Sequence, residues 1–386
     1  MNTNNNITNM SNPITATAQK PGQAVNLMTA SHQWATRPED QRFTSLTDLF
    51  ASVNSRRMNS RAADVDLTNV RVKTNEAGQL VVNGLIQPAT PSHWAFGQLA
   101  TTAKAPANYL RTLPQEISVP ALNHGLQVLA DRDDVKLMTI TDPDGGTNTL
   151  QAVTSTSYGR IWDADCVQAV QRIVERSGGA FFNPKAYNRF TGESTPSGLY
   201  ASDRDVFMFM INGGSRLDVG PRAKLNRGFI VSNSEVGNAT FKLTTFLFNE
   251  VCGNHIIWGA QNINQLCIRH TSGGPSRFDL QAMPTLQAYI NSSAAPEEAA
   301  IARAVDRIVL PNGTRDELQA FLSKHGKFTK AEVTGAYDFA RAEEGDCKTL
   351  WHVVQGLTAY ARGFEYIDAR VDIETRAGSL LKLATN

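Results

Sequence analysis

"ATFKLTTFLFNEVC", residues 239 to 252, predicts a strand in the middle of a sheet. Large apolar side chains occupy both parities of this segment, so we expect both of its faces to be covered. The chain around it, from about residue 200 to 270, continues in the same manner with "DVFMFMI", "RGFIVSN", "HIIWG" and "LCIRH". This region therefore predicts the central sheet of the fold.

Helical patterns surround this sheet in the sequence. From residue 284 to the end, apolar residues recur at spacings of three and four, with Thr314, Thr329 and Asp346 as N-caps. A smaller helical pattern fills residues 91 to about 130, where Pro106, Pro114 and Pro120 suit first turns. Strands followed by a block of helices predict an α+β fold with a mixed, largely antiparallel central sheet, a small helical insertion and a C-terminal helical block.

The chain divides into three parts by composition. Residues 1–43 are rich in Asn, Thr, Ser and Gln and predict a disordered N-terminal arm. Residues 44–283 form the predicted α+β core domain. Within it, residues 64–72 and 80–86 predict a hairpin with its turn at residues 75–78, and residues 163–177 predict an amphipathic helix. Residues 284–386 form a C-terminal helical region, which either stands apart or covers the sheet.

The composition narrows the classes of function. Lysine and arginine number 37 against 36 aspartates and glutamates, so a partner of one charge sign must be bound by a local patch. Four cysteines are too few for a disulfide framework, which favours a reducing compartment. No stretch has the roughly 20 apolar residues of a membrane-spanning helix. We expect a cytoplasmic protein without membrane association, in the host cytoplasm if the gene belongs to a phage.

Two Cys-x-x-His pairs supply the ligand types of a zinc site: Cys252 with His255, and Cys267 with His270. Residues three apart in a strand point to opposite faces, so Cys267 and His270 cannot share a metal ion if this segment is extended. The sequence favours two strand ends with a buried thiol over the zinc set. We expect no metal and no other cofactor.

Common catalytic signatures are missing from the sequence. It holds no G-x-x-x-x-G-K-[ST] phosphate loop, no strand-linked G-x-G-x-x-G, no H-E-x-x-H and no G-x-S-x-G. His255, His270 and His352 are candidate general bases, but spacing alone assembles no nucleophile, base and orienting group. Whether the protein is an enzyme stays open, and the sequence leans against it.

Two segments have the composition of a nucleic-acid surface. "GGAFFNPKAYNRFTG", residues 178 to 192, mixes aromatic rings, which stack on unpaired bases, with cations, which hold phosphates. "RLDVGPRAKLNRG", residues 216 to 228, adds a local excess of positive charge. For both segments the alternative is ordinary structure, with aromatics packed in the core and a solvated basic loop.

Three stretches, in this order, resemble a family of phage and plasmid proteins catalogued as domain of unknown function 932. They are "AFGQLATTAKAPANYLRTLP" with "ALNHGL" (95–126), "AVTSTSYGRIWDADCVQAV" (152–170), and "EVCGNHIIWGAQ" with "IRHTSG" (250–273). The closing block from residue 349 to 381 also fits. The family pattern emphasises Cys252, Asn254, Arg269 and His270 but not His255 or Cys267, which weakens the zinc hypothesis. The resemblance implies a gene of a mobile element and carries no activity.

These observations leave three hypotheses of function. The first is a DNA-metabolism protein of a phage or mobile element that binds single-stranded DNA or RNA, with strand annealing on a Rad52-like core as its specific form. The second is a self-assembling structural or host-interference protein, and we expect a homo-oligomer. The third is an enzyme acting on a nucleotide or other small substrate, with Asn254 and His270 in its site. The predicted nucleic-acid-binding residues are Tyr158, Arg160, Phe182, Lys185, Tyr187, Arg189, Arg222, Lys224, Arg227 and Arg269.

Overall fold

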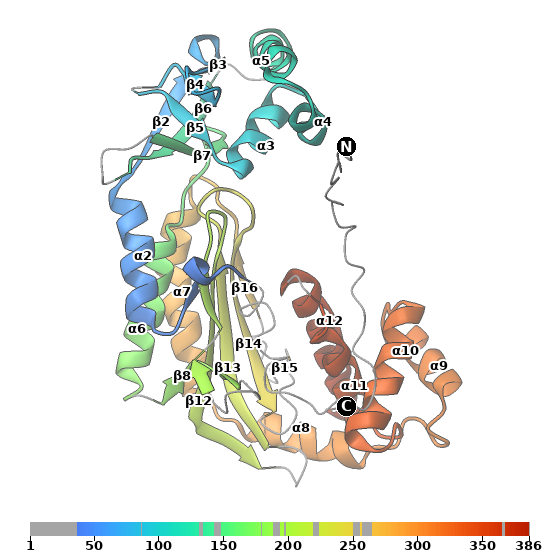
Figure 1. The fold of residues 1–386 in the computed structure, drawn as a ribbon. Helices are drawn as coiled ribbons and strands as arrows, with labels where there is room; N and C mark the ends of the chain where they lie inside the picture. Colours follow the sequence, from blue (N-terminus) through green and yellow to red (C-terminus); the bar gives the residue numbers. More distant parts are fainter. Residues whose placement is uncertain are drawn as a thin grey trace, which may run out of the picture.

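The computed structural model describes residues 37–85, 87–130, 134–142, 148–178, 180–187, 194–196, 198–218, 224–249, 255–256, 265–364 and 367–385. Within these residues it confirms the α+β class, because an antiparallel sheet, a smaller mixed sheet and a C-terminal helical block account for the fold (Figure 1). The central sheet and the mixed sheet are two separate sheets, where the sequence predicted one. No helix of the described chain is long and apolar enough to cross a membrane.

The antiparallel sheet, sheet A, forms the centre of the molecule. Its described strands follow the order β1-β11-β12-β13-β14-β15, with β16 also paired to β14 and β8 to β12. The longest neighbours, β12, β13 and β14, carry the segments that the sequence assigned to the sheet centre. The strands are β1 (Arg42–Phe43), β8 (Phe181–Phe182), β11 (Leu199–Ala201), β12 (Val206–Asp218), β13 (Lys224–Asn233), β14 (Phe241–Asn249), β15 (His255–Ile256) and β16 (Gln265–Ile268).

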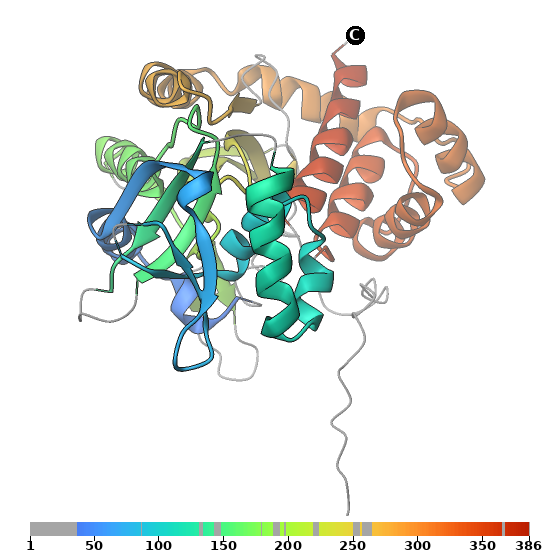
Figure 2. The same ribbon diagram turned by 90° about the horizontal axis from the view of Figure 1, so that it is seen from above.

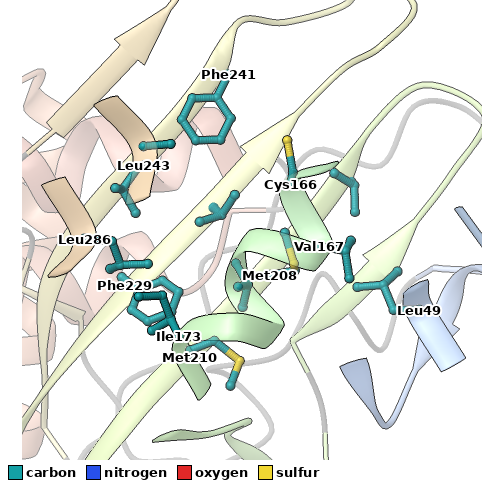
Figure 3. Close-up of a cluster of buried hydrophobic side chains, with 14 of the residues drawn as sticks. Leu49, Cys166, Val167, Ile173, Met208, Met210, Phe229, Phe241, Leu243 and Leu286 are labelled. Carbon is teal, nitrogen blue, oxygen red and sulfur yellow. The ribbon is translucent and has the colours of Figure 1, made fainter. Parts of the chain in front are cut away.

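Both faces of sheet A are buried, as the two-sided pattern of residues 239–252 predicts. One face packs on α2 (Leu46–Met58), α6 (Asp163–Arg176) and α7 (Gly274–Asn291), and Figure 3 shows part of this cluster. In β14, Phe241 and Leu243 belong to this face. The opposite face carries an aromatic layer that includes Phe246 and Phe248 of β14. The full layer is Tyr200, Phe207, Phe209, Ile211, Ile230, Phe246 and Phe248.

The mixed sheet, sheet B, lies beyond one end of sheet A, together with the predicted helical insertion (Figures 1 and 2). Its described strands follow the order β2-β6-β7-β5-β4-β3, and only β5 and β7 pair in parallel. Its elements are β2 (Ser60–Asp66), η3 (Leu67–Asn69), β3 (Arg71–Thr74), β4 (Leu80–Asn83), β5 (Ala89–Pro91), α3 (His93–Thr102), α4 (Ala107–Thr112), α5 (Gln115–His124), the π-helical segment η4 (Gly125–Leu129), β6 (Asp134–Ile140) and β7 (Asn148–Thr154). A separate two-stranded sheet joins β9 (Lys185–Tyr187) to β10 (Ser194–Pro196).

The C-terminal helices form a block with its own core, to which Leu217, Leu225 and Leu247 of sheet A contribute. Thr314 and Thr329 form the predicted capping boxes. The third cap is Thr349 rather than Asp346, because the Thr349 hydroxyl accepts the His352 N–H at 3.2 Å. The elements are α8 (Ala295–Asp306), α9 (Arg315–His325), α10 (Lys330–Phe339), η5 (Ala340–Glu344), α11 (Leu350–Ala361), α12 (Ile367–Ser379) and η6 (Leu380–Ala384).

The structure moves both predicted domain boundaries. Residues 37–43 of the predicted arm are ordered, because β1 pairs with β11 and Arg37 contacts Asp205 at 3.0 Å; residues 1–36 lie outside the described chain. The predicted boundary at residues 283/284 falls inside α7, which packs on sheet A. The helical block therefore begins after α7.

Two local predictions also change. The predicted hairpin is formed by β3 and β4, whereas β2 turns away at η3 and pairs with β6. Pro120 lies inside α5 rather than in a first turn, while Pro106 and Pro114 immediately precede their helices as expected. The predicted strand at residues 64–72 is thus divided by η3 between two strands with different partners, and α5 continues through Pro120.

Gly356 permits the close packing of α11 against α10. A Cβ atom at this position would lie 2.2 Å from the Ala336 carbonyl oxygen. We expect Gly356→Ala to lower the free energy of unfolding by about 1–3 kcal/mol in urea titrations, since the helices must separate to admit the methyl group. The control is Gly273→Ala, where a Cβ meets nothing within 4 Å. Equal stability of the two variants would contradict this account of the packing.

Candidate functional site

The Tyr158 and His270 motifs, far apart in the sequence, converge in the structure. The two rings stack with centroids 5.0 Å apart and an interplanar angle of 13°. The Gly159 N–H donates to the His270 carbonyl at 3.2 Å, and the Ile161 N–H donates to His270 Nδ1 at 3.3 Å. A Cβ at Gly159 would lie 2.0 Å from the Thr271 carbonyl oxygen, so only glycine allows this approach. The loop that links β7 to α6 is thus fixed to the segment after β16.

Arg160 extends this contact into a column of rings and guanidinium groups. Its guanidinium carbon lies 5.4 Å from the Tyr158 ring centroid and 5.5 Å from that of Trp162, and Nη1 donates to the Glu235 carbonyl. Arg57 contacts the Trp162 ring in turn, at 5.5 Å. Burial raises the pKa of Tyr158, whose neutral hydroxyl donates to the Ser234 carbonyl at 3.1 Å.

This column corrects two predicted roles. Arg160 is 9% exposed, so its guanidinium is turned inward and does not reach a phosphate on the surface. Tyr158 uses its ring for His270 and Arg160 and its hydroxyl for the backbone, which removes it as a base-stacking platform. Both residues hold the fold together at the boundary of the two sheets.

A buried pair of carboxyl groups lies beside the column. Asp163 at the start of α6 is fully buried and Glu235, after β13, is 3% exposed. The Asp163 N–H donates to Glu235 Oε2 at 3.1 Å, and Asn233 Nδ2 donates to Asp163 Oδ1 at 2.8 Å. Arg56 of α2 supplies the positive charge, with Nη2 at 3.1 Å from Asp163 Oδ2 and 3.7 Å from Glu235 Oε1.

The environment of Asp163 suppresses the ionisation of its carboxyl group. Burial, together with the neighbouring Glu235, raises the pKa of Asp163 well above its ordinary value, while Arg56 and Asn233 oppose the rise. The sequence predicts the helix that begins at Asp163 but does not single out Asp163, Arg56, Asn233 or Glu235 as a group. Their close association depends on tertiary folding, and no local spacing in the sequence signals it.

The two aromatic and basic segments both border β12, in the part of sheet A away from sheet B (Figure 1): the first pairs with it through β8, and the second forms its end and the start of β13. Phe182 of β8 pairs with Ile211 of β12, and farther along β12 Arg216 pairs with Asn226 of β13. Phe182 is 43% exposed, Arg216 is exposed, and Lys224 at the start of β13 is half-buried. We call these three residues the sheet end.

Several predicted binding residues cannot be placed at this surface. Lys185 and Tyr187 belong to β9, but their side chains lie outside the described structure, as do Arg189 and Arg222 entirely. Arg269 follows β16, is exposed, and lies next to His270 rather than in the sheet end.

The structure assigns Arg227 to the interior, which corrects its predicted phosphate contact. It is 4% exposed, and its Nη1 and Nη2 donate to the backbone and hydroxyl of Ser292 at 2.8 and 2.7 Å. Its guanidinium carbon lies 4.2 Å from the Tyr289 ring centroid, and Nη2 lies 3.7 Å from Glu297. Arg227 therefore fastens the end of α7 and the start of α8 to sheet A.

The described chain gives no support to the zinc set. Cys267 is exposed and contacts the Thr240 hydroxyl at 3.2 Å, whereas His270 packs against Tyr158. The sequence predicted a buried thiol at the strand ends, and for Cys267 this prediction is wrong. Cys252, Asn254 and the His255 side chain lie outside the described residues, within which no group of three or more His, Cys, Asp and Glu could hold a metal ion.

Comparison with known proteins adds no relative. The chain matches no protein-family model, no curated protein and no solved structure. The resemblance to the phage and plasmid family accordingly stays a prediction, and the function has to be argued from geometry and chemistry.

Protonation of His270 should weaken the fold. Burial, with a contribution from the Arg160 charge, lowers the pKa of His270 from 6.5 to about 4. As the pH falls, the unfolded chain binds a proton at His270 near pH 6.5, whereas the folded chain binds it only near pH 4. Protonation therefore favours the unfolded chain, and part of the stability that is present above pH 6.5 is lost as the pH falls towards 4. We expect this loss to be roughly 1–3 kcal/mol in urea titrations at stepped pH.

The variant His270→Phe keeps the ring and removes the titrating group. It should lose about 1 kcal/mol at all pH values, because the Ile161 N–H loses its acceptor, but it should lack the additional loss at acid pH. The control His93→Phe, at the exposed start of α3, should retain the acid loss. Identical pH profiles for wild type and His270→Phe would contradict the assignment.

Proposed function

We propose that the protein binds single-stranded nucleic acid through the sheet end. The observation that supports this most is the strand pairing at one end of sheet A: β8 and β13 flank β12 there, so Phe182, Arg216 and Lys224 belong to the same part of the sheet. Single-strand surfaces combine aromatic faces for bases with cations for phosphates. Phe182 and Arg216 are exposed and Lys224 is half-buried, whereas Arg160 is buried.

Phe182 is held in a position suited to stacking. A Cβ at Gly213 would lie 2.9 Å from Phe182 Cε1, so the ring lies directly against the backbone of β12. Gly213 and Gly214 are exposed and leave open surface next to the ring. A ring fixed in this way loses little conformational entropy when a base stacks on it, which favours binding.

The charge balance makes such binding local and dependent on salt. The formal net charge is +1, so no global field draws nucleic acid to the protein. Affinity must come from Arg216, Lys224 and the basic residues of the adjoining segments, and it should fall steeply as salt rises. Annealing of complementary strands, the specific form of this hypothesis, would use the same surface on two bound strands.

Substitutions at the sheet end separate stacking from charge. Phe182→Ala should weaken binding of an oligodeoxythymidine roughly 5- to 150-fold at low ionic strength, because a base–aromatic stack contributes about 1–3 kcal/mol. Lys224→Gln should lower the slope of log affinity against log salt by about 0.7, the value for one phosphate contact of a single strand. Fluorescence anisotropy at several salt concentrations measures both quantities.

Matched controls lie elsewhere on the surface. Leu280→Ala removes an exposed apolar side chain from α7, and Lys324→Gln removes an exposed charge from α9. Both should bind like wild type. The proposal fails if wild-type protein does not bind the oligonucleotide at low ionic strength, or if Phe182→Ala and Lys224→Gln bind as the controls do.

Self-association is the second candidate, and exposed apolar residues of the helical insertion favour it. Tyr109, Ile117 and Val128 are 61%, 53% and 65% exposed, and Leu129 is 44% exposed. Ile117 and Val128 lie about three helical turns apart on the continuous α5–η4 rod and so share a face. Apolar side chains gathered on one surface mark contact sites between proteins.

The second candidate predicts that charge on this face dissociates the assembly. If copies of the chain associate here, Ile117→Asp combined with Val128→Asp should reduce the mass measured by multi-angle light scattering to that of the monomer. The fold should persist, since both side chains point to solvent. The control pair is Leu280→Asp with Met58→Asp, at exposed apolar positions of α7 and α2. A monomeric wild type, or an unchanged mass of the double variant, would exclude this interface.

A further inference from the structure

A cleft of about 280 Å³ opens between the two sheets, beside the buried carboxyl pair. Sheet B contributes one wall through β6 and β7, while α2, the segment before β1 and the strand ends of sheet A contribute the rest. Small-molecule sites occur preferentially where two modules meet. The lining residues are Asp40, Gln41, Ser52, Arg56, Met138, Ile140, Gln151, Ala201, Ser202, Asp203, Glu235 and Val236.

Negative charge dominates the cleft. Asp40 and Asp203 are exposed, while Glu235 is buried. Arg56 is the lining cation, but Asp163, Glu235 and the Ser202 carbonyl already engage its guanidinium. The cleft therefore presents carboxylates at two depths, of which the exposed Asp203 also pairs with Arg204 at the surface, with Nε 3.5 Å from Oδ1.

Glu235 offers a ligand a hydrogen-bond acceptor inside the cleft. Its side chain is only 4% exposed, and Oε2 is occupied by the Asp163 N–H at 3.1 Å. Oε1 lies 3.7 Å from Arg56 Nη2, which is beyond hydrogen-bonding distance, and no donor among the described residues bonds to it. This oxygen is not fully enclosed and lines the cleft, so a ligand N–H group entering the cleft would find a free acceptor position there.

The remaining lining defines the body of the ligand. Met138 and Ile140 from sheet B and Ala201 and Val236 from sheet A are apolar, whereas Gln41, Ser52 and Gln151 are neutral and polar. We propose that this cleft binds a small organic cation, with an amine or guanidinium group at Glu235 and a short aliphatic chain between the apolar walls. A second cationic group at the other end of the chain would lie near the exposed Asp40 and Asp203.

Agmatine tests the proposal, because it joins a guanidinium and an amine through an aliphatic chain. Isothermal titration calorimetry of the full chain should show binding at one site per chain, and agmatine should raise the melting temperature. Succinate, which reverses the charges, should do neither. Glu235→Gln should weaken agmatine binding roughly 10- to 150-fold, because it removes a hydrogen bond to a charged group.

Glu235→Gln also alters the buried pair, so exposed positions provide an independent test. Asp40→Asn and Asp203→Asn should each weaken agmatine binding by up to about fivefold, as expected for exposed ion pairs. Asp279→Asn, an exposed aspartate of α7, is the matched control and should have no effect. All of these variants should bind the oligodeoxythymidine like wild type, because the sheet end is a separate surface.

Two outcomes would overturn the proposal. One is the absence of both binding heat and thermal shift when agmatine is added to wild-type protein, which would leave the cleft to water. The other is agmatine binding that is equal in wild type, Asp40→Asn, Asp203→Asn and the Asp279→Asn control, which would place the ligand elsewhere.

Discussion

The contact of Arg56 with Asp163 and Glu235 holds together the elements through which the chain passes between the two sheets. Removing two carboxyl groups and a guanidinium from water costs several kcal/mol per ion, and only closely placed partners offset this cost. The partners come from α2, the start of α6 and the residues around the end of β13. Because α2 leads into β2 and the loop after β7 leads into α6, both chain connections between the sheets begin or end at this network.

The sequence could predict what periodicity encodes. Strands with apolar residues on both faces predicted sheet A, and apolar residues spaced three and four apart predicted the terminal helices. Thr314 and Thr329 were correctly predicted as N-caps. It could not predict the buried charges, because cations are usually solvated and only tertiary partners make their burial tolerable. Arg160 and Arg227 were therefore predicted to bind nucleic-acid phosphates on the surface. No pattern in the sequence predicted that Arg56, Asp163 and Glu235 lie together.

The candidate site, too, could be predicted only in part. The sequence singled out Tyr158 and His270, and they do meet, but as a stacked pair within the scaffold at the boundary of the sheets. The two aromatic and basic segments both border β12 at the opposite end of sheet A, where Phe182 stays accessible. The difference follows from packing: one end of the sheet is covered by sheet B, and the other end is not. Scaffold and proposed binding surface thus lie at opposite ends of one sheet.

This separation gives the cleft a distinct place in the molecule. Its walls come from both sheets, and Glu235 belongs both to its lining and to the network with Arg56 and Asp163. A cation bound at Glu235 would compete with Arg56 for the same carboxylate, and its charge would favour ionisation of Asp163. Occupancy of the cleft would therefore bear on how firmly α2 is held to the start of α6 and to Glu235, while the exposed strands at the far end would keep their contacts.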